Sequence, residues 1–502
     1  MTRVILDCYT DEPAGLGVPP FLGVYPRYLY GYLKEQSSEE IFYLTIDDLR
    51  LFVNYRNKKK ETKVSEKTNI RVHNLTKNSA DIRNILANAE TIYIILGVHV
   101  PGKYLTGMPG TLKELNELFE KLNTIINVNA KKVLTGPVVY GTQLFGGKFF
   151  EKADLNNYQV ADLNYSYKKI DELSIIGAEI VDQINDPKRD ENKKGYKVIE
   201  IETGHGCSIG KCSFCTEPLK NKLEFRKKDG VINEIKELYK KGERHFRIGK
   251  QTCFYTYPDA VELLKDIRTE CKDIKTLHID NVNPVMVTTS KGIQISETIV
   301  KYCTPGNVAA LGIESFDPEV IAENNLCTHP ETAMNAIRSI NSFGAKKGSN
   351  GMPMYLPGLN LIFGLCGESK RTHEHNMTML KEIINSNLLL RRINIRQAVI
   401  MPGTKLEEKC GNKFLRKNKK YYWKWRNDIR QNIDYPMLQK LVPKGDVLKD
   451  CIAEIYDGKT TFLRQIGTYP LIIGVKKRLE LRKFYNLKVV GHMLRSIVGE
   501  VV

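Results

Sequence analysis

Short apolar runs alternate with longer amphipathic segments along the first third of the chain. The apolar runs at 40–46 and 91–100 predict buried strands, and the segment 111–125 carries apolar residues at helical spacing. Strands that alternate with helices favour a parallel sheet with helices on both faces. The lysine-rich stretch 55–67 is expected to form a solvated loop, and the absence of a G-x-G-x-x-G motif argues against a dinucleotide site. The first third is therefore expected to be one α/β domain.

A second strand–helix rhythm begins after a polar, charged stretch at 182–195, which we expect to be a linker. Six apolar segments separated by helical patterns predict six parallel strands joined by helical crossovers. They lie at 196–202, 244–251, 274–281, 308–315, 358–369 and 388–400. Six such units are too few for a closed eight-stranded barrel, so a partial (βα)6 barrel is expected over 196–404. Its functional loops should lie at the carboxyl ends of the strands.

The last part of the chain changes to alternation with a period of two, which predicts β-strands. The segment 456–459 (YDGK) has the composition of a hairpin turn. We expect a small β-barrel over 436–502, preceded by a basic, aromatic linker or helix at 405–435. The predicted fold class is α/β: a parallel α/β domain at 1–181, the partial barrel, and the small C-terminal β-barrel.

Length and composition are those of a soluble, multidomain protein. The 502 residues suggest about three domains, and the 42% hydrophobic content is ordinary for a globular chain. No apolar run is long enough to predict a membrane helix, and the N-terminal residues do not form a signal-peptide pattern. We therefore expect a cytoplasmic protein without a membrane partner.

The net charge of +18 is concentrated near the C-terminus. Residues 405–430 hold ten Lys/Arg against three Asp/Glu, a net charge of +7, and residues 436–502 hold twelve against six, a net charge of +6. Such a region attracts polyanions, and nucleic acid is the first candidate. Four aromatic rings lie among the lysines, a combination typical of surfaces on which bases stack. They are Tyr421, Tyr422, Trp423 and Trp425. The alternative is that these rings dock a helix onto the β-barrel.

Three cysteines lie within nine residues in the stretch GHGCSIGKCSFCTEP, directly after the first predicted strand of the partial barrel. They are Cys207, Cys212 and Cys215. A structural zinc site needs a fourth ligand; His205 is available, but it lies only two residues from Cys207 and no second C-x-x-C pair exists. Three thiolates without a fourth suit a [4Fe–4S] cluster that keeps one iron open. We favour this cluster over zinc.

The remaining eight of the eleven cysteines are scattered along the chain. Their spacing is not that of a disulfide framework, and disulfides are rare in reducing compartments. We expect most of them to be buried, inert, small apolar residues.

The cysteine loop, with Phe214 before its last cysteine, and the βα repeats resemble the radical S-adenosylmethionine (SAM) superfamily. The usual spacing there is three residues and then two, whereas this chain has four and then two. Four later segments, IGKQ, LGIES, LNLIFGLCGES and RRINIRQAVIMPGT, resemble the family motifs at the ends of the second, fourth, fifth and sixth strands. In the family these lie near the amine, the ribose and methionine, and the adenine of SAM.

The resemblance implies which residues bind the two cofactors. Cys207, Cys212 and Cys215 would hold a [4Fe–4S] cluster. The residues expected near SAM are Phe214, Gly249, Lys250, Gln251, Glu314, Ser315, Gly364 and Arg396. Cys366 stands where proline is common in the family, and we interpret it as structural. No catalytic acid or base is identified, because Glu368, His373 and His375 are equally well explained as helix caps or surface groups.

The chemistry implied by the resemblance is one-electron chemistry. The reduced cluster passes an electron to SAM, the C–S bond breaks, and a 5′-deoxyadenosyl radical abstracts a hydrogen atom. An electron donor such as a ferredoxin or a flavodoxin is an expected partner.

The flanking parts resemble two groups within the superfamily. The tRNA methylthiotransferases also combine an α/β domain, a radical core and a basic TRAM-type barrel, but their N-terminal domain holds three further cysteines where this chain has only Cys8. Sulfur insertion is therefore not expected.

Residues 1–181 also resemble the Rossmann-like domain of the cobalamin-dependent members, which leaves cobalamin open as a third cofactor. His99 would be a candidate cobalt ligand, although a lone histidine is more often structural; residues 135–137 and 146–147 would be backbone contacts.

Three functional hypotheses result from the sequence. The first is a radical SAM enzyme that modifies a macromolecule such as tRNA, docked through the basic C-terminal region. The second is a cobalamin-dependent radical SAM methyltransferase that acts on a protein or a small molecule. The third is a non-catalytic nucleic-acid-binding protein with a structural metal.

Overall fold

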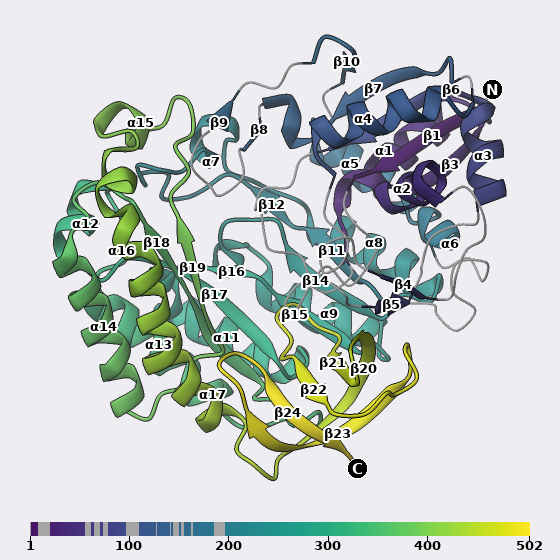
Figure 1. Ribbon diagram of the computed structural model, residues 1–502. Helices are drawn as coiled ribbons and strands as arrows, with labels where there is room; N and C mark the ends of the chain where they lie inside the picture. The colour runs from purple at the N-terminus through teal and green to yellow at the C-terminus, as the bar shows by residue number, and fades with distance from the viewer. Residues whose placement is uncertain are drawn as a thin grey trace.

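A five-stranded parallel sheet forms the N-terminal part of the protein (Figure 1). The computed structural model describes residues 2–8, 21–55, 62–64, 71–73, 79–96, 110–126, 128–140, 142–143, 150–151, 155–161, 164–184 and 196–502. The strands are β1 (Thr2–Asp7), β3 (Glu40–Thr45), β6 (Ala89–Ile95), β7 (Lys131–Thr135) and β10 (Gln159–Val160). Their order in the sheet is β10-β7-β6-β1-β3. Counted along the chain this is the doubly wound order 2-1-3-4-5, which changes direction between β1 and β6.

Helices cover both faces of this sheet, as the alternation of apolar runs predicted. Val4 and Leu6 pack on one side with three helices, whereas Ile5 points to the other side and packs with two more. The first set is α2 (Ile46–Tyr55), α3 (Ser79–Ala87) and α4 (Leu112–Asn123); the second is α1 (Val24–Gln36) and α6 (Ile180–Ile184), and α5 (Tyr167–Gly177) packs on α1. The second layer joins the sheet to the core of the molecule, because α5 also packs against α8 (Lys228–Lys240).

Six parallel strands with outer helices form the core, which confirms the predicted partial (βα)6 barrel. The strands are β11 (Val198–Glu202), β14 (His245–Gly249), β15 (Thr276–Ile279) continued by β16 (Asn281–Val282), β17 (Asn307–Glu314), β18 (Tyr355–Phe363) and β19 (Arg392–Gln397). The larger helices around them are α8, α9 (Ala260–Glu270), α11 (Ser290–Tyr302), α13 (Pro330–Gly344) and α14 (Lys370–Asn385). Shorter helices follow some strands: α7 (Glu217–Lys220), α10 (Pro284–Val287) and α12 (Pro318–Glu323). Because every strand is parallel to its neighbours, all the strand-to-helix loops lie at one end of the core.

The C-terminal part is a closed five-stranded barrel preceded by helices. The helices are α15 (Lys405–Lys409), α16 (Lys413–Ile429), a π-helical turn (Arg430–Asp434) and α17 (Tyr435–Leu441). The barrel consists of β20 (Val447–Asp457), β21 (Thr460–Gln465), β22 (Ile473–Val475), β23 (Phe484–His492) and β24 (Ile497–Val501). It closes in the order β20-β21-β22-β24-β23 and back to β20. The predicted turn at 456–459 is confirmed, because Asp457 pairs with Thr460 across Gly458 and Lys459.

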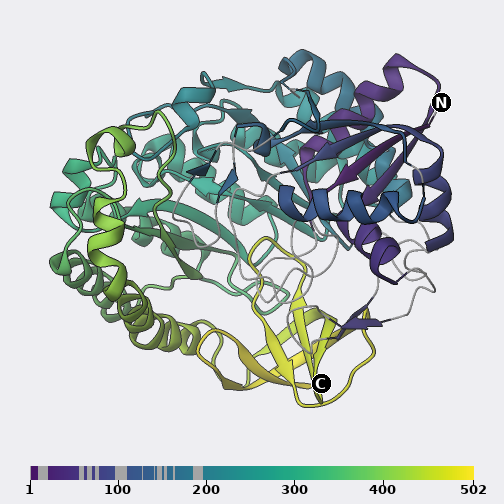
Figure 2. The ribbon, with the colours of Figure 1, turned by 45° about the horizontal axis from the view of Figure 1, so that its top comes forward.

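Two short segments of the N-terminal part pair with later parts of the chain. The strand β2 (Phe21–Leu22), between β1 and α1, runs parallel to β11 of the core. The hairpin of β4 (Thr62–Val64) and β5 (Arg71–His73) adds to the C-terminal barrel, where Val72 pairs with Ile455. Figure 2 shows this hairpin beside the barrel. The prediction that 55–67 is a loop is therefore wrong for 62–64: threonine and valine there give the strand apolar and β-branched residues.

Candidate functional site

The cysteine loop leaves the core directly after β11, at the carboxyl end of the strands. It is closed by a two-residue ladder between β12 (Gly204–His205) and β13 (Glu224–Phe225). Gly206, between this ladder and Cys207, has a φ of +79°, and a Cβ there would lie 2.4 Å from the Lys222 carbonyl oxygen. Only glycine fits this position. The glycine at position 206 is thus explained by the turn between the ladder and Cys207.

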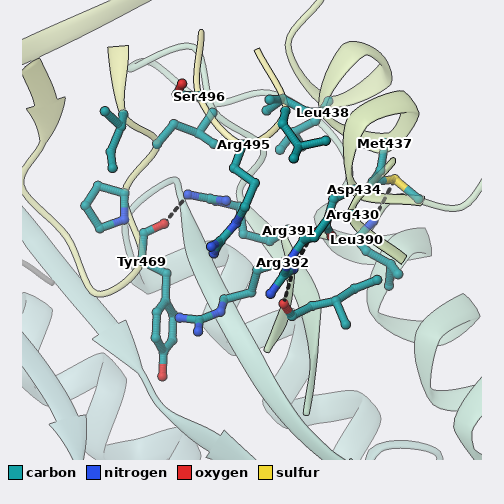
Figure 3. A pocket seen from close by; sticks show the side chains of 16 residues that line it. Leu390, Arg391, Arg392, Arg430, Asp434, Met437, Leu438, Tyr469, Arg495 and Ser496 are labelled. Atoms are coloured by element: carbon teal, nitrogen blue, oxygen red, sulfur yellow. Dashed lines mark hydrogen bonds and ion pairs between the residues drawn. The ribbon is translucent and has the colours of Figure 1, made fainter. Parts of the chain in front are cut away.

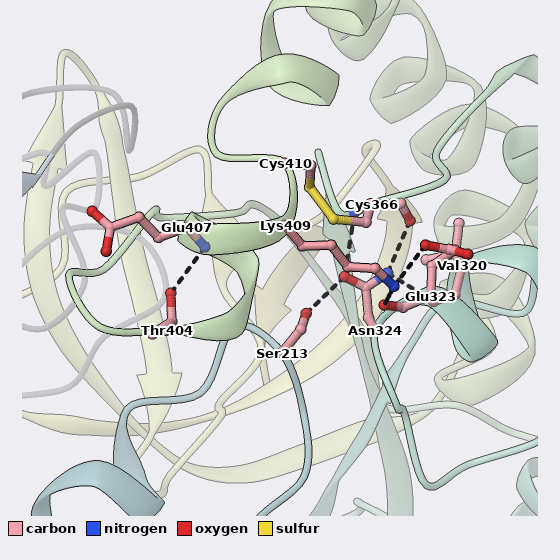
Figure 4. Close-up of a disulfide and its surroundings, with 9 residues drawn as sticks. All are labelled: Ser213, Val320, Glu323, Asn324, Cys366, Thr404, Glu407, Lys409 and Cys410. Carbon is pink, nitrogen blue, oxygen red and sulfur yellow. Dashed lines mark hydrogen bonds and ion pairs between the residues drawn. A yellow bond between two sulfur atoms is a disulfide. The ribbon is translucent and has the colours of Figure 1, made fainter.

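Asn324, from the end of α12, holds the middle of the loop (Figure 4). The Ser213 hydroxyl donates to Oδ1 of Asn324 at 2.7 Å, and the Ser213 amide donates to the Asn324 carbonyl at 2.9 Å. On the other side, Nδ2 of Asn324 donates to the Cys366 carbonyl at 2.9 Å. The Ser213 carbonyl in turn accepts from the amide of Leu406 on α15. Ser213, one of the two residues between Cys212 and Cys215, is therefore attached to the end of α12, to α15 and, through Asn324, to the loop after β18.

The three thiols of the loop are free and half-buried. Burial raises the pKa of Cys215, and the nearby Cys207 thiol acts in the same direction. A hydrogen bond with the thiol of Cys327 raises the pKa of Cys212 and turns this side chain toward the loop after α12. Within the described ranges, no three His, Cys, Asp or Glu side chains are arranged as a finished metal site. The donor set of three adjacent free thiols fits a [4Fe–4S] cluster with an open iron, once Cys212 leaves Cys327.

The zinc alternative is weakened by the position of His205. Its Nδ1 lies 2.6 Å from the hydroxyl of Tyr167 on α5, and its Nε2 lies 3.5 Å from Glu224. The two ring nitrogens therefore face Tyr167 and Glu224, which weakens the case for His205 as a fourth ligand.

The end of β14 contributes two side chains with different roles. Lys250, whose φ is +58°, donates to Glu202 at 3.1 Å and lies over the ring of Tyr25 from α1. It contacts the N-terminal part, and nearby Glu202 raises its pKa against the effect of burial. Gln251 is only 5% exposed, yet neither its Nε2 nor its Oε1 has a hydrogen-bond partner among the described residues. A buried amide without partners is costly, by about 1–3 kcal/mol, so the Gln251 side chain has hydrogen-bonding capacity to spare at this strand end.

Gly249 and Thr252 lie directly before and after Lys250 and Gln251 in the sequence. A Cβ at Gly249 would lie 3.3 Å from the Arg247 guanidinium, so the strand passes close to that side chain. The Thr252 hydroxyl donates to the Gly206 carbonyl at 2.8 Å. The second strand end is thereby attached to the cysteine loop.

Glu314 ends β17 in a left-handed conformation, with a φ of +63°. Burial raises its pKa to about 8, although Arg396 on β19 acts in the opposite direction. Its Oε2 has no hydrogen-bond partner among the described residues. The Cys327 thiol lies beside this carboxyl group and contributes to the raised pKa. Glu314 thus lies close to the thiols and to Arg396 at one edge of the core.

Three predicted residues hold the surrounding structure. The Ser315 hydroxyl accepts from the amide of Asp317, the residue that caps the start of α12. Gly364 has a φ of +97°, and a Cβ there would lie 2.2 Å from Leu415 on α16. Phe214 packs in a small apolar cluster with residues of α12 and α15. None of these three contacts points to a ligand.

Glu368 and His373 also have structural partners. The Glu368 carboxylate accepts from the Gly364 amide at 2.6 Å and from the side chain of Asn418 at 2.9 Å. The ring of His373 stacks on Trp425 with a centroid distance of 5.5 Å. These contacts support the interpretation that neither is the catalytic acid or base.

Cys366 and Cys410 form a disulfide, contrary to the expectation that the scattered cysteines are unpaired (Figure 4). It joins the loop after β18 to the residue after α15. The Cys366 carbonyl accepts a hydrogen bond from Asn324, which also bonds to Ser213. The disulfide is therefore connected to the cysteine loop through Asn324. A sequence separation of 44 between the two cysteines gives no spacing signal, which is why the sequence did not reveal the pair.

Cys327 is a site residue that sequence reasoning missed. Its thiol contacts the side chains of Cys212, Asn283 and Thr328. These bonds lower the pKa of Cys327 to about 6. In the sequence it is a lone cysteine that follows Cys215 by 112 positions (327 − 215). Only the folding of the core brings it to the loop.

The aromatic residues of α16 divide into two groups. Tyr422 and Trp425 are buried against Phe363 of β18, and Tyr421 stacks on Trp425. These rings dock the helix, but onto the core and not onto the β-barrel. Trp423 alone among the four is well exposed, at 62%, with the Arg426 guanidinium 5.4 Å from its ring centroid. The predicted stacking surface is therefore reduced to one ring.

Some predicted features lie outside the described residues. They are His99, residues 146–147 and residues 185–195 of the expected linker. No helix in the described part of the chain has the length and apolar character needed to cross a membrane.

Comparisons with known proteins agree with this geometry. Residues 201–362, from β11 to β18, match the Radical SAM superfamily. An uncharacterized protein of Methanocaldococcus jannaschii is 38% identical over 99% of this chain and 93% of its own length. One from Archaeoglobus fulgidus is 37% identical over 99% of this chain and 90% of its own length.

A solved structure extends the likeness to the fold. It is the cobalamin-dependent SAM radical enzyme OxsB with aqua-cobalamin and SAM bound, at 13% identity and a TM-score of 0.50. The match covers 84% of this chain and 56% of that chain. Because the matched residues include the cysteine loop and the fold is shared, this chain belongs to the radical SAM superfamily: it is an enzyme whose cofactors include a [4Fe–4S] cluster and SAM, and which needs an electron donor.

Proposed function

We propose that this protein is a radical SAM methyltransferase that uses cobalamin held by its N-terminal sheet. The observation that carries the proposal is the 2-1-3-4-5 strand order, with its change of direction between β1 and β6. In sheets of this kind, ligands bind at the carboxyl ends of the strands where the order reverses. The chain leaves β1 at that edge and next pairs with β11 of the core through β2. This connection supports a cofactor placed between the sheet and the cysteine loop.

Residues at this edge of the sheet fit a bound cofactor. Thr135, the last residue of β7, is 1% exposed, and its hydroxyl has no hydrogen-bond partner among the described residues. Gly136 follows with a φ of +92°, and a Cβ there would lie 2.8 Å from the Leu96 carbonyl oxygen. A buried hydroxyl without a partner at this edge suits a polar group of a bound cofactor. OxsB, which shares the fold, binds cobalamin according to its structure.

The cysteine loop and its neighbours have assigned roles in this proposal. Cys207, Cys212 and Cys215 hold the [4Fe–4S] cluster, which when bound supplies the electron that cleaves SAM. Gln251 binds a polar group of SAM through its unpartnered amide, and Glu314 does the same through its free Oε2. Asn324 keeps the loop in place, and the helices around the strands exclude water from the reacting groups.

Metal analysis of the anaerobically purified, reconstituted protein tests these assignments. The expected result is four irons and, after incubation with hydroxocobalamin, one cobalt per chain with a corrin absorbance. Cys207→Ala should lose the iron, whereas Cys327→Ala, the matched control on the facing loop, should keep it. Thr135→Val should weaken cobalamin binding by about 3- to 10-fold and leave the iron unchanged. Iron without cobalt under these conditions would contradict the cobalamin proposal.

A second candidate concerns the substrate: a structured RNA such as tRNA. It is favoured by Trp423, an exposed ring beside Arg426 on the basic helix α16. Stacking of one base on such a ring contributes about 1–3 kcal/mol, so Trp423→Ala should weaken RNA binding by about tenfold. Ile293→Ala removes a 39% exposed apolar side chain from α11 and is the control. Equal RNA binding by both variants and the parent would exclude this surface.

A further inference from the structure

A cavity lined by arginines lies where the core, the π-helical turn and the C-terminal barrel meet (Figure 3). Its volume is about 280 Å³. Arg391 and Arg392 come from the start of β19, Arg430 from the π-helical turn, and Arg495 from the loop between β23 and β24. The thiols lie at the opposite, carboxyl end of the strands; β19 alone is six residues long, which spans about 20 Å. The cavity is therefore separate from the proposed cofactor site.

Positive charge in the cavity is only partly balanced. The lining contains four arginines and one acidic residue, Asp434, a net charge of +3. Asp434 is already paired with Arg430 across the π-helical turn. Burial, together with repulsion from Arg392 and Arg495, lowers the pKa of Arg391 to about 9. Guanidinium groups that repel one another in this way are stabilised by an anion placed between them.

Three of the arginines also hold the parts of the molecule together. Arg391 donates to the carbonyl of Tyr469, Arg392 lies over the Tyr469 ring at 4.2 Å, and Arg430 donates to the Ile393 carbonyl at 2.8 Å. These contacts fix the side chains around the cavity, so the site is preorganised. Arg495 is different: it is exposed, and no hydrogen bond or ion pair joins it to another residue in the described part of the chain.

We propose that this cavity binds the phosphate group of a phosphorylated ligand. Several guanidinium forks around one space match the tetrahedral, doubly charged phosphate, which accepts paired N–H donors. A volume of about 280 Å³ is at the lower end for small-molecule sites, which run from about 300 Å³ upward, so it suits a group of mononucleotide size. One wall is apolar, formed by Met437, Leu441 and Ile472, and would contact the body of the ligand. Such a phosphate could come from a free nucleotide or from the backbone of an RNA.

Calorimetric titration of the full-length, reconstituted protein tests the site. The probes are a nucleoside 5′-monophosphate, the corresponding nucleoside and a short single-stranded RNA. Arg495→Ala should weaken binding of the phosphorylated probes by about 10- to 100-fold, and Arg495→Lys by less, because lysine keeps the charge but not the fork. Lys488→Ala, an exposed cation on β23 outside the cavity, is the matched control and should bind as the parent does.

The two sources of phosphate are distinguished by the same titrations. A response of the mononucleotide to Arg495→Ala indicates a free ligand, and a response of the RNA alone indicates a backbone phosphate. The nucleoside should not bind in either case. Equal affinity of Arg495→Ala and the parent for every probe, or no binding of any phosphorylated probe, would overturn the proposal. None of these results depends on the iron or cobalt content. The phosphate site and the cofactor assignments are therefore tested independently of each other.

Discussion

The hydroxyl of Ser213 donates to Oδ1 of Asn324 across 111 residues of sequence, at a distance of 2.7 Å. Both residues are buried, and Asn324 also bonds to the carbonyl groups of Val320 and Cys366. One amide side chain thus joins the middle of the cysteine loop to α12 and to the loop after β18. The position of the thiols depends on a residue far from them in sequence.

Asn324→Ala should therefore loosen the cysteine loop. It leaves buried groups without partners, each at a cost of about 1–3 kcal/mol, so the free energy of unfolding should fall by at least that amount. Reconstituted iron should also be lost faster during dilution under anaerobic conditions. The control is Asn335→Ala, on the exposed face of α13. Equal rates of iron loss in both variants would show that Asn324 does not hold the loop.

Glu234 on α8 joins the N-terminal part to the core through two arginines. Its carboxylate accepts from Arg27 of α1 at 2.7 Å and from Arg226 at 2.6 Å, and all three side chains are fully buried. Glu234→Gln leaves two buried cations underpaired, so the free energy of unfolding should fall by about 3–5 kcal/mol. Urea denaturation at pH 7 measures this, with Glu237→Gln on the surface of the same helix as control.

The effect of Glu234→Gln should depend on pH in a defined direction. Burial alone would raise the pKa of Glu234, but the two guanidinium groups outweigh it and lower the pKa below 4.5. The ionised carboxylate then stabilises the fold above pH 4.5, and this contribution is lost as the pH falls through the lowered pKa. The difference between parent and variant should narrow in that acidic range. A difference that stays constant there would contradict the buried ion pair.

Glu368 should give the opposite pH dependence. Burial raises its pKa to about 7, against an ordinary value of 4.5. The folded state therefore holds a proton that the unfolded state has already released, and stability falls as the pH rises from 4.5 to about 7. Relative to Glu368→Gln, the parent should be more stable at pH 5 than at pH 8. Glu408→Gln, an exposed change on α15, should show no such trend in the same urea titrations.

The disulfide between Cys366 and Cys410 should stabilise the region around α16. It closes a loop with a sequence separation of 44 that includes α14 and β19, and closing a loop of this size contributes about 2–4 kcal/mol. A reductant should lower the thermal midpoint of the parent to that of Cys410→Ser and leave the variant unchanged. If the reductant affects both proteins equally, the stabilisation does not come from this bond.

Local patterns in the sequence were enough to predict the strands of the core and the cysteine loop. Strands such as 307–314 are marked by apolar runs, and Gly206 marks a turn that only glycine can make. The residues that complete the site were not predictable, because they arrive from distant segments. Cys327 has no other cysteine near it in the sequence, and Arg495, in the separate arginine cavity, comes near Arg391 only after the barrel has packed on the core. Trp425 likewise packs against Phe363 of a distant strand, and the periodicity of its own helix does not predict that contact.

The β4–β5 hairpin can complete its pairing only after the C-terminal barrel has been synthesised. Val72 pairs with Ile455, so 383 residues separate the two partners. A ribosome adding roughly 5–20 residues per second needs about 20–80 seconds to make that stretch. During this interval the edge of the hairpin has no strand to pair with, although the N-terminal sheet can already form. The pairing of β5 with β20 can therefore form only late in synthesis, after the C-terminal barrel strand has been made.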